Sequence, residues 1–170
     1  MTRFTLKHTF PTDPDTFWSR VFFAAEYNQG LYAALKYRVW EELEKTTDAA
    51  GKVRRRAKME PGFDAPAILK KLIGDGISYV EDGTWDPKTG KWTYSIVPSK
   101  MPDKVKTHGE YWLEPRGDKQ LERICTVNID ASIFGVGGAL ESYLEKTTRE
   151  SYEVAARFTR DYLAKHGLSG

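Results

Sequence analysis

Residues 138–166 read GALESYLEKTTRESYEVAARFTRDYLAKH and form the longest stretch of helical period in the chain. Seven of these residues recur at steps of four and three, which places them on one face of a helix. This stripe consists of Leu140, Leu144, Thr147, Ser151, Ala155, Phe158 and Tyr162. Opposite charges four residues apart, such as Glu145 and Arg149, indicate that the remaining surface faces water. The spacing predicts one amphipathic helix of about eight turns.

The middle of this stripe is made of small residues. Thr147, Ser151 and Ala155 follow two leucines and precede Phe158 and Tyr162. One interpretation is that large side chains of a facing sheet fill the core, so the small residues only let the sheet approach the helix. The other is that the helix roofs a cavity, in which case the three small residues and Phe158 would contact a ligand.

Length, charge and cysteine content restrict the class of protein. A chain of 170 residues has the usual size of one domain, so we expect residues 1–170 to form a single domain. The net charge of +2 gives no reason to expect a nucleic-acid partner. The single cysteine excludes an internal disulfide framework. Neither a signal-peptide pattern nor a run of ~18 apolar residues occurs, and we expect a cytoplasmic protein.

The cysteine and the histidines show no pattern typical of a metal or catalytic site. His8, His108 and His166 are scattered, without the spacing to carboxylates or cysteines that would predict a relay or a zinc ion. Cys125 stands near Val127 in an apolar strand and is interpreted as an inert core thiol. We therefore expect no metal and no cofactor.

Residues ahead of the long helix alternate with period two, which predicts strands. Residues 3–10 form the first strand, and two short helices are expected after it, over 13–25 and 31–35 with a break at Gln29 and Gly30. The other strands are expected at 37–46, 52–59, 77–85, 91–97, 105–113 and 121–133.

A short amphipathic helix is predicted at residues 66–73, PAILKKLI. Its apolar side is made of Ile68, Leu69, Leu72 and Ile73. Glycines at 62, 74 and 76 flank it and can act as hinges. Because short hinged segments often cover binding sites, we interpret these four residues as a lid over the cavity mouth.

This order of elements, together with IFGVGGALESYLEKTTRESYEVAARFTRDYL at 133–163, resembles the START-like helix-grip superfamily, also called SRPBCC. It is most similar to an uncharacterised bacterial branch with a Gly-Gly-x-x-Glu turn before the last helix. The resemblance implies an α+β fold in which a curved antiparallel sheet of about six to seven strands wraps around a long C-terminal helix. It also implies a barrel that binds lipids, sterols or polyketides, and a minority of members are cyclases or dehydratases.

Charged residues fall on the side of the strands that is otherwise apolar. Taking that side as inward places Glu41, Arg55 and Arg123 in the interior with Tyr94 and Tyr111. An unpaired buried charge costs several kcal/mol, so the three charges should pair with one another or line the cavity and contact the ligand. The alternative is a bulge or a register slip that turns them outward.

Residues 52–58 hold five cations in seven positions. Such a run is usually a solvated strand face, but it would also suit transient contact with an anionic membrane surface. The leading hypothesis is binding, and as a carrier also transport, of a hydrophobic or lipid-like small molecule between sheet and helix. The alternatives are a polyketide-type cyclase or dehydratase, with Glu41 or a tyrosine moving the proton, and a ligand-responsive regulatory module.

Overall fold

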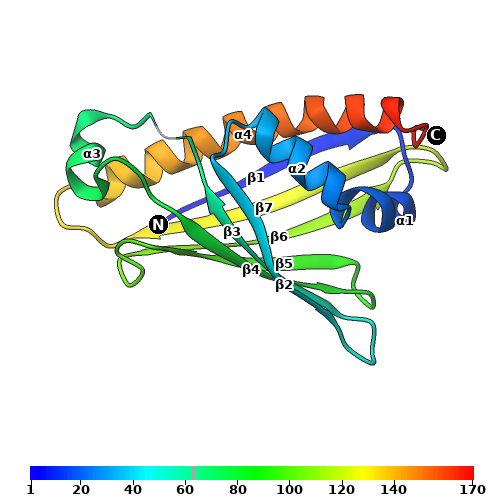
Figure 1. The fold of residues 1–170 in the computed structure, drawn as a ribbon, viewed down its shortest axis with the longest axis horizontal. Helices are drawn as coiled ribbons and strands as arrows, with labels where there is room; N and C mark the ends of the chain where they lie inside the picture. Colours follow the sequence, from blue (N-terminus) through cyan, green and yellow to red (C-terminus); the bar gives the residue numbers. More distant parts are fainter. Residues whose placement is uncertain (63) are drawn as a thin grey trace.

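A seven-stranded antiparallel sheet curls around one long helix in the computed structural model, which describes residues 1–62 and 64–170 (Figure 1). The strands lie side by side in the order β1-β7-β6-β5-β4-β3-β2, so the first and last strands of the chain pair with each other. The α+β helix-grip fold predicted from the sequence is confirmed. The strands are β1 (Thr2–Phe10), β2 (Val39–Thr47), β3 (Val53–Glu60), β4 (Tyr79–Asp86), β5 (Lys91–Pro98), β6 (Val105–Pro115) and β7 (Leu121–Ala131).

The long helix α4 packs against β1 and β7 and beside α2 (Figure 1). None of the helices in the described part of the chain is long and apolar enough to cross a membrane. Asp13 begins the first helical segment, because its carboxylate accepts a hydrogen bond from the Thr16 backbone N–H at 2.9 Å. The helices are α1 (Pro14–Phe17), the π-helix η1 (Trp18–Phe22), α2 (Ala25–Ala34), α3 (Ala67–Ile73) and α4 (Gly137–Lys165).

The predicted helix break at Gln29 and Gly30 is wrong, because α2 runs through both residues. A Cβ atom on Gly30 would lie 2.8 Å from the Phe158 ring. The glycine therefore lets α2 approach α4 closely, which is a reason for glycine inside a helix that the sequence pattern does not show.

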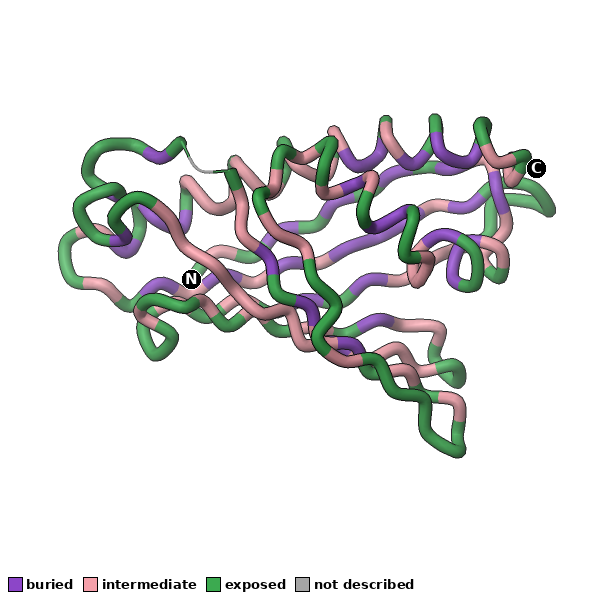
Figure 2. Tube along the Cα trace, in the orientation of Figure 1, coloured by how far each residue is buried: buried purple, intermediate pink, exposed green. Residues whose placement is uncertain are grey.

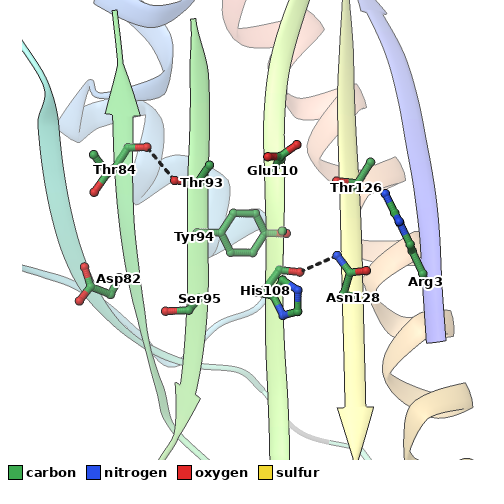
Figure 3. A pocket seen from close by; sticks show the side chains of 11 residues that line it. Arg3, Asp82, Thr84, Thr93, Tyr94, Ser95, His108, Glu110, Thr126 and Asn128 are labelled. Atoms are coloured by element: carbon green, nitrogen blue, oxygen red, sulfur yellow. Dashed lines mark hydrogen bonds between the residues drawn. The ribbon is translucent and has the colours of Figure 1, made fainter. Parts of the chain in front are cut away.

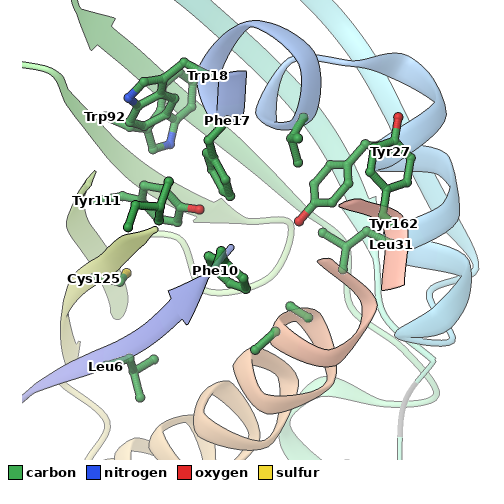
Figure 4. Close-up of a cluster of buried hydrophobic side chains, with 14 of the residues drawn as sticks. Leu6, Phe10, Phe17, Trp18, Tyr27, Leu31, Trp92, Tyr111, Cys125 and Tyr162 are labelled. Carbon is green, nitrogen blue, oxygen red and sulfur yellow. The ribbon is translucent and has the colours of Figure 1, made fainter. Parts of the chain in front are cut away.

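The main core fills one end of the molecule, where β1, the C-terminal half of α4 and the segment from α1 to α2 meet (Figures 2 and 4). Aromatic rings dominate it, and they pack edge to face or stacked: the Trp18 and Phe22 rings are 4.9 Å apart. A separate small cluster lies at the other end of α4, beside α3, and contains Ala65, Leu69, Ala131 and Leu140.

Inward and outward faces follow the predicted alternation on β3, β5, β6 and β7 but not on β2. Trp40 is paired with the buried Met59, and directly paired residues point to the same face of a sheet, so Trp40 faces inward. Glu41 is paired with Lys58, is exposed and faces outward. A bulge between Glu42 and Glu44 then shifts the register of the strand.

The basic run at residues 52–58 is largely paired with acidic side chains of neighbouring strands. Arg54 donates two hydrogen bonds to the Asp82 carboxylate, at 3.1 and 2.7 Å. The Lys52 ammonium lies 3.6 Å from the Asp86 carboxylate. Exposed pairs of this kind contribute little stability, but they neutralise most of the local charge. The interpretation as a solvated strand face is therefore the better one for this stretch.

Candidate functional site

A cavity of about 630 Å³ lies between the concave face of the sheet and helices α2 and α4. Its volume is in the range of small-molecule sites. Exposed residues in its lining, among them Lys36, Asp64, Lys100 and Glu150, mark a mouth between the end of α2, the loop after β3 and the middle of α4. Seven of the predicted ligand-contacting residues line this cavity: Arg55, Tyr94, Tyr111, Arg123, Thr147, Ser151 and Ala155.

Two residues expected in the cavity lie elsewhere. Glu41 points to solvent, for the reason of register given above. Phe158 packs against α2, where its ring lies 5.7 Å from the Tyr27 ring and directly over Gly30. The helix stripe therefore changes role along its length, since its small central residues border the cavity and its aromatic end packs on α2.

Two glycines shape the floor of the cavity. A Cβ atom on Gly83 would lie 2.0 Å from the Trp92 indole, and one on Gly109 would lie 2.6 Å from the Tyr94 hydroxyl oxygen. Both rings thus lie flat against the sheet over a glycine of a neighbouring strand, a known way to cover glycines in curved sheets. The flat rings leave space below α4 and give the cavity an aromatic floor.

Arg123 on β7 places a guanidinium in this cavity. The residue is 3 % exposed, and its guanidinium carbon lies 4.9 Å from the Phe10 ring centroid and 5.0 Å from that of Tyr152. Among the described residues no ion pair involves Arg123, and its Nε atom has no hydrogen-bond partner. A buried guanidinium without a carboxylate retains capacity to bind an anion.

His8 connects Arg123 to the protein surface. Its Nδ1 atom lies 3.0 Å from Arg123 Nη2, and its Nε2 atom lies 2.8 Å from an oxygen of the exposed Glu153. Burial lowers the pKa of His8 and favours the neutral ring, in which Nδ1 accepts from Arg123 and Nε2–H donates to Glu153. Sequence spacing could not reveal these contacts of His8, because both partners are more than 100 positions away.

Glu81 on β4 supplies the interior carboxylate that the sequence analysis assigned to Glu41. It lines the cavity, and its Oε1 atom lies 3.9 Å from Nη2 of the buried Arg55. Burial raises the pKa of the Glu81 carboxyl, and the charge of Arg55 opposes part of this rise. Strand alternation does not single out Glu81, because Asp82 beside it makes both faces of the strand acidic.

The predicted lid helix α3 lies beside the N-terminal part of α4 (Figure 1), and its last residue, Ile73, lines the cavity. Its four apolar residues divide: Leu69 and Ile73 are buried, whereas Ile68 and Leu72 are exposed. Of the four, only Ile73 lines the cavity, and Leu69 belongs instead to the small cluster that includes Leu140 of α4. The assignment of Ile68 and Leu72 to the inner side of a lid is therefore wrong, because a two-turn helix buries only one side.

A second, shallow hollow of about 620 Å³ lies on the convex face of the sheet (Figure 3). Its lining is mostly polar, and weak hydrogen bonds cross it, such as Asn128 Nδ2 to the His108 carbonyl oxygen at 3.5 Å. His108 faces outward here, as predicted. Apolar walls and buried charges converge in the first cavity and not in this hollow, so the first cavity is the candidate site.

The fold is that of START-like helix-grip proteins. A START superfamily protein from Mycobacterium smegmatis superposes with a TM-score of 0.63 at 11% identity, covering 96% of this chain and 97% of that chain. A protein from Thermus thermophilus superposes with a TM-score of 0.67 at 16% identity, covering 97% of this chain and 99% of that chain. The Zhui aromatase/cyclase from Streptomyces sp. R1128 superposes with a TM-score of 0.62 at 12% identity, covering 94% of each chain. At these identities the likeness establishes the fold alone.

The chain belongs to the family described as protein of unknown function DUF2505, whose sequence profile matches residues 5–163. A comparison with curated proteins finds no match. The function must therefore be argued from the cavity itself.

Proposed function

We propose that the protein binds a hydrophobic or lipid-like small molecule with one acidic end in the cavity between the curved sheet and α4. The observation that carries this proposal is Arg123, a buried guanidinium that lines a mainly apolar cavity and has no carboxylate partner among the described residues. A carboxylate or phosphate on the ligand would supply the missing charge and accept two hydrogen bonds from the guanidinium.

His8 supports this role for Arg123. A neutral imidazole takes one hydrogen bond from the guanidinium without neutralising it, so the positive charge stays available. A glutamate at the same place would have formed a closed ion pair. The arrangement orients the guanidinium and leaves its charge for a ligand.

Arg123→Met should weaken binding of octadecenoate at least about tenfold, because a hydrogen bond to a charged group contributes roughly 1.5–3 kcal/mol. The methyl ester of the same acid should bind wild type and variant alike. Calorimetric titration of both ligands measures this difference. Arg157→Met, which changes an exposed arginine of α4, is the matched control and should change neither affinity.

Equal losses for the acid and the ester would show that Arg123 is not the polar anchor. Failure of the wild-type protein to bind either compound would contradict the proposed function itself.

A polyketide-type cyclase or dehydratase is the second candidate, and Glu81 is the observation that favours it. Burial raises the pKa of the Glu81 carboxyl, so it holds a proton more readily than an exposed glutamate, as a general acid requires. The fold likeness to an aromatase/cyclase is compatible with this alternative but shows no activity. Binding is the more economical proposal, since it requires only the anchor and the apolar walls.

We also propose that α3 is a lid that closes on bound ligand. Its helix rests on a small cluster separate from the main core, and Gly74 after it has a φ angle of +67°. The Lys100 ammonium donates hydrogen bonds to the carbonyl oxygens of Ile73 and Gly76, which hold the end of α3 to the loop after β5. Such a unit is expected to open locally at a lower cost than the sheet.

Amide hydrogen exchange in residues 67–73 should slow several-fold when octadecenoate is added, because a filled cavity gives Ile73 a new apolar contact. Mass spectrometry of peptides measures the rates. The tip of the β2–β3 hairpin, residues 48–51, is the internal control and should not change. Equal exchange rates in residues 67–73 with and without bound ligand would contradict the proposal that α3 is a lid.

A further inference from the structure

Arg55 and Glu81 face each other inside the cavity without forming a hydrogen bond. The two residues stand on the neighbouring strands β3 and β4, where Glu81 pairs with Ala57, two positions from Arg55. The distance of 3.9 Å from Arg55 Nη2 to Glu81 Oε1 allows Coulomb attraction but is too long for a hydrogen bond.

Both groups have unused hydrogen-bonding capacity. The Arg55 guanidinium donates one hydrogen bond, from Nη1 to the Phe22 carbonyl oxygen at 3.2 Å, and its buried Nε has no partner. The Glu81 carboxyl receives no hydrogen bond from any residue that the structure describes. Aromatic walls surround the pair, since the Arg55 guanidinium carbon lies 4.8 Å from the Phe22 ring centroid and 5.3 Å from that of Trp92. Polar groups in such surroundings are costly to leave unpaired.

We propose that Arg55 and Glu81 form a second polar subsite that binds a hydroxyl group of the ligand. This inference rests on the proposed binding function and specifies the ligand class: an apolar acid that also carries an alcohol or a phenol. A hydroxyl oxygen can accept a hydrogen bond from the guanidinium while its proton is donated to the carboxylate. A second carboxylate would be repelled by Glu81, and an ammonium would be repelled by Arg55.

The two subsites stand on different strands of the sheet. Arg123 is on β7 and Glu81 is on β4, three strands away across the sheet, which corresponds to roughly 14 Å between the strands. Because the two side chains enter the cavity from strands that far apart, we expect the hydroxyl group to stand several carbons from the acidic end of the ligand. A hydroxyl next to the carboxylate would remain at Arg123 and could not reach Glu81.

The test compares three ligands that differ only in a hydroxyl group: octadecanoate, 12-hydroxyoctadecanoate and 2-hydroxyoctadecanoate. The 12-hydroxy acid should bind the wild-type protein about tenfold more tightly than octadecanoate, whereas the 2-hydroxy acid should show no gain. Glu81→Leu should abolish this preference, so that octadecanoate and the 12-hydroxy acid bind the variant with equal affinity. Asp82→Asn, which changes the outward-facing neighbour on the same strand, should retain the preference.

Equal affinities of the wild-type protein for octadecanoate and the 12-hydroxy acid would overturn the subsite, as would a preference that survives in Glu81→Leu. If Glu81→Leu does not fold, Glu81→Gln serves instead, and it should lose most of the preference because its amide cannot supply a charged acceptor. The neutral alcohol 1-dodecanol separates this inference from the proposed function. Binding of 1-dodecanol that depends on Glu81, without binding of any acid, would refute the acidic-ligand proposal and support the subsite.

Discussion

Gly83→Ala should lower the free energy of unfolding by about 3 kcal/mol, because the added methyl group would overlap the Trp92 indole. All three of the nearest atoms to a Cβ at this position belong to Trp92, at 2.0 to 2.6 Å. Trp92 is 2 % exposed and packed against Phe22 and Phe23, so its ring cannot move aside without disturbing the core. Thermal unfolding should show a decrease in Tm of roughly 6–12 °C for a chain of this size.

A double-mutant cycle tests the cause of this loss. Trp92→Leu removes the indole, so adding Gly83→Ala to it should cost much less than adding Gly83→Ala to the wild-type protein. Gly138→Ala is the matched control, since a Cβ there meets nothing within 4 Å. A change below about 0.5 kcal/mol for Gly83→Ala would mean that the ring lies over the glycine by accident and does not shape the cavity floor.

Local patterns were sufficient to predict most of the helices and strands, and the family resemblance implied how they are arranged. The amphipathic period of residues 138–166 and the alternation of the strands depend on neighbours within a few positions, and α4 begins and ends within one residue of the prediction. The inward positions of Arg55 and Arg123 followed from the same alternation, because their strands are regular and carry most of their apolar residues on one face.

The site itself was less predictable, because its decisive contacts join distant parts of the chain. The contacts of His8 with Glu153 and Arg123 span 145 and 115 positions. The inward assignment of Glu41 failed because β2 is an edge strand with a bulge, on which alternation does not identify the inner face. Phe158 matched the helical stripe, but the approach of α2 at Gly30 decided where its ring packs.

Ser151→Trp should abolish binding of octadecenoate while leaving cooperative unfolding intact. Ser151 lines the cavity from the middle of α4, between Thr147 and Ala155 on the same stripe, and it is only partly buried. An indole at this position would point from the helix toward the aromatic floor formed by Trp92 and Tyr94. It would occupy the space that an acyl chain needs, so we expect a loss of affinity of about a hundredfold or more, equivalent to roughly 2.8 kcal/mol.

The control for this prediction is Ser142→Trp, which adds the same side chain at an exposed position of α4 outside the cavity lining. It should bind octadecenoate as the wild type does, so nonspecific effects of a surface indole can be subtracted. Unfolding followed by circular dichroism checks that both variants fold. Because the cavity already has room beneath α4, Ser151→Trp should not be destabilised as an overpacked core would be. Normal octadecenoate binding by folded Ser151→Trp would mean that the ligand does not lie beneath the small residues of α4. A ligand held by Arg123 would then have to occupy another part of the cavity.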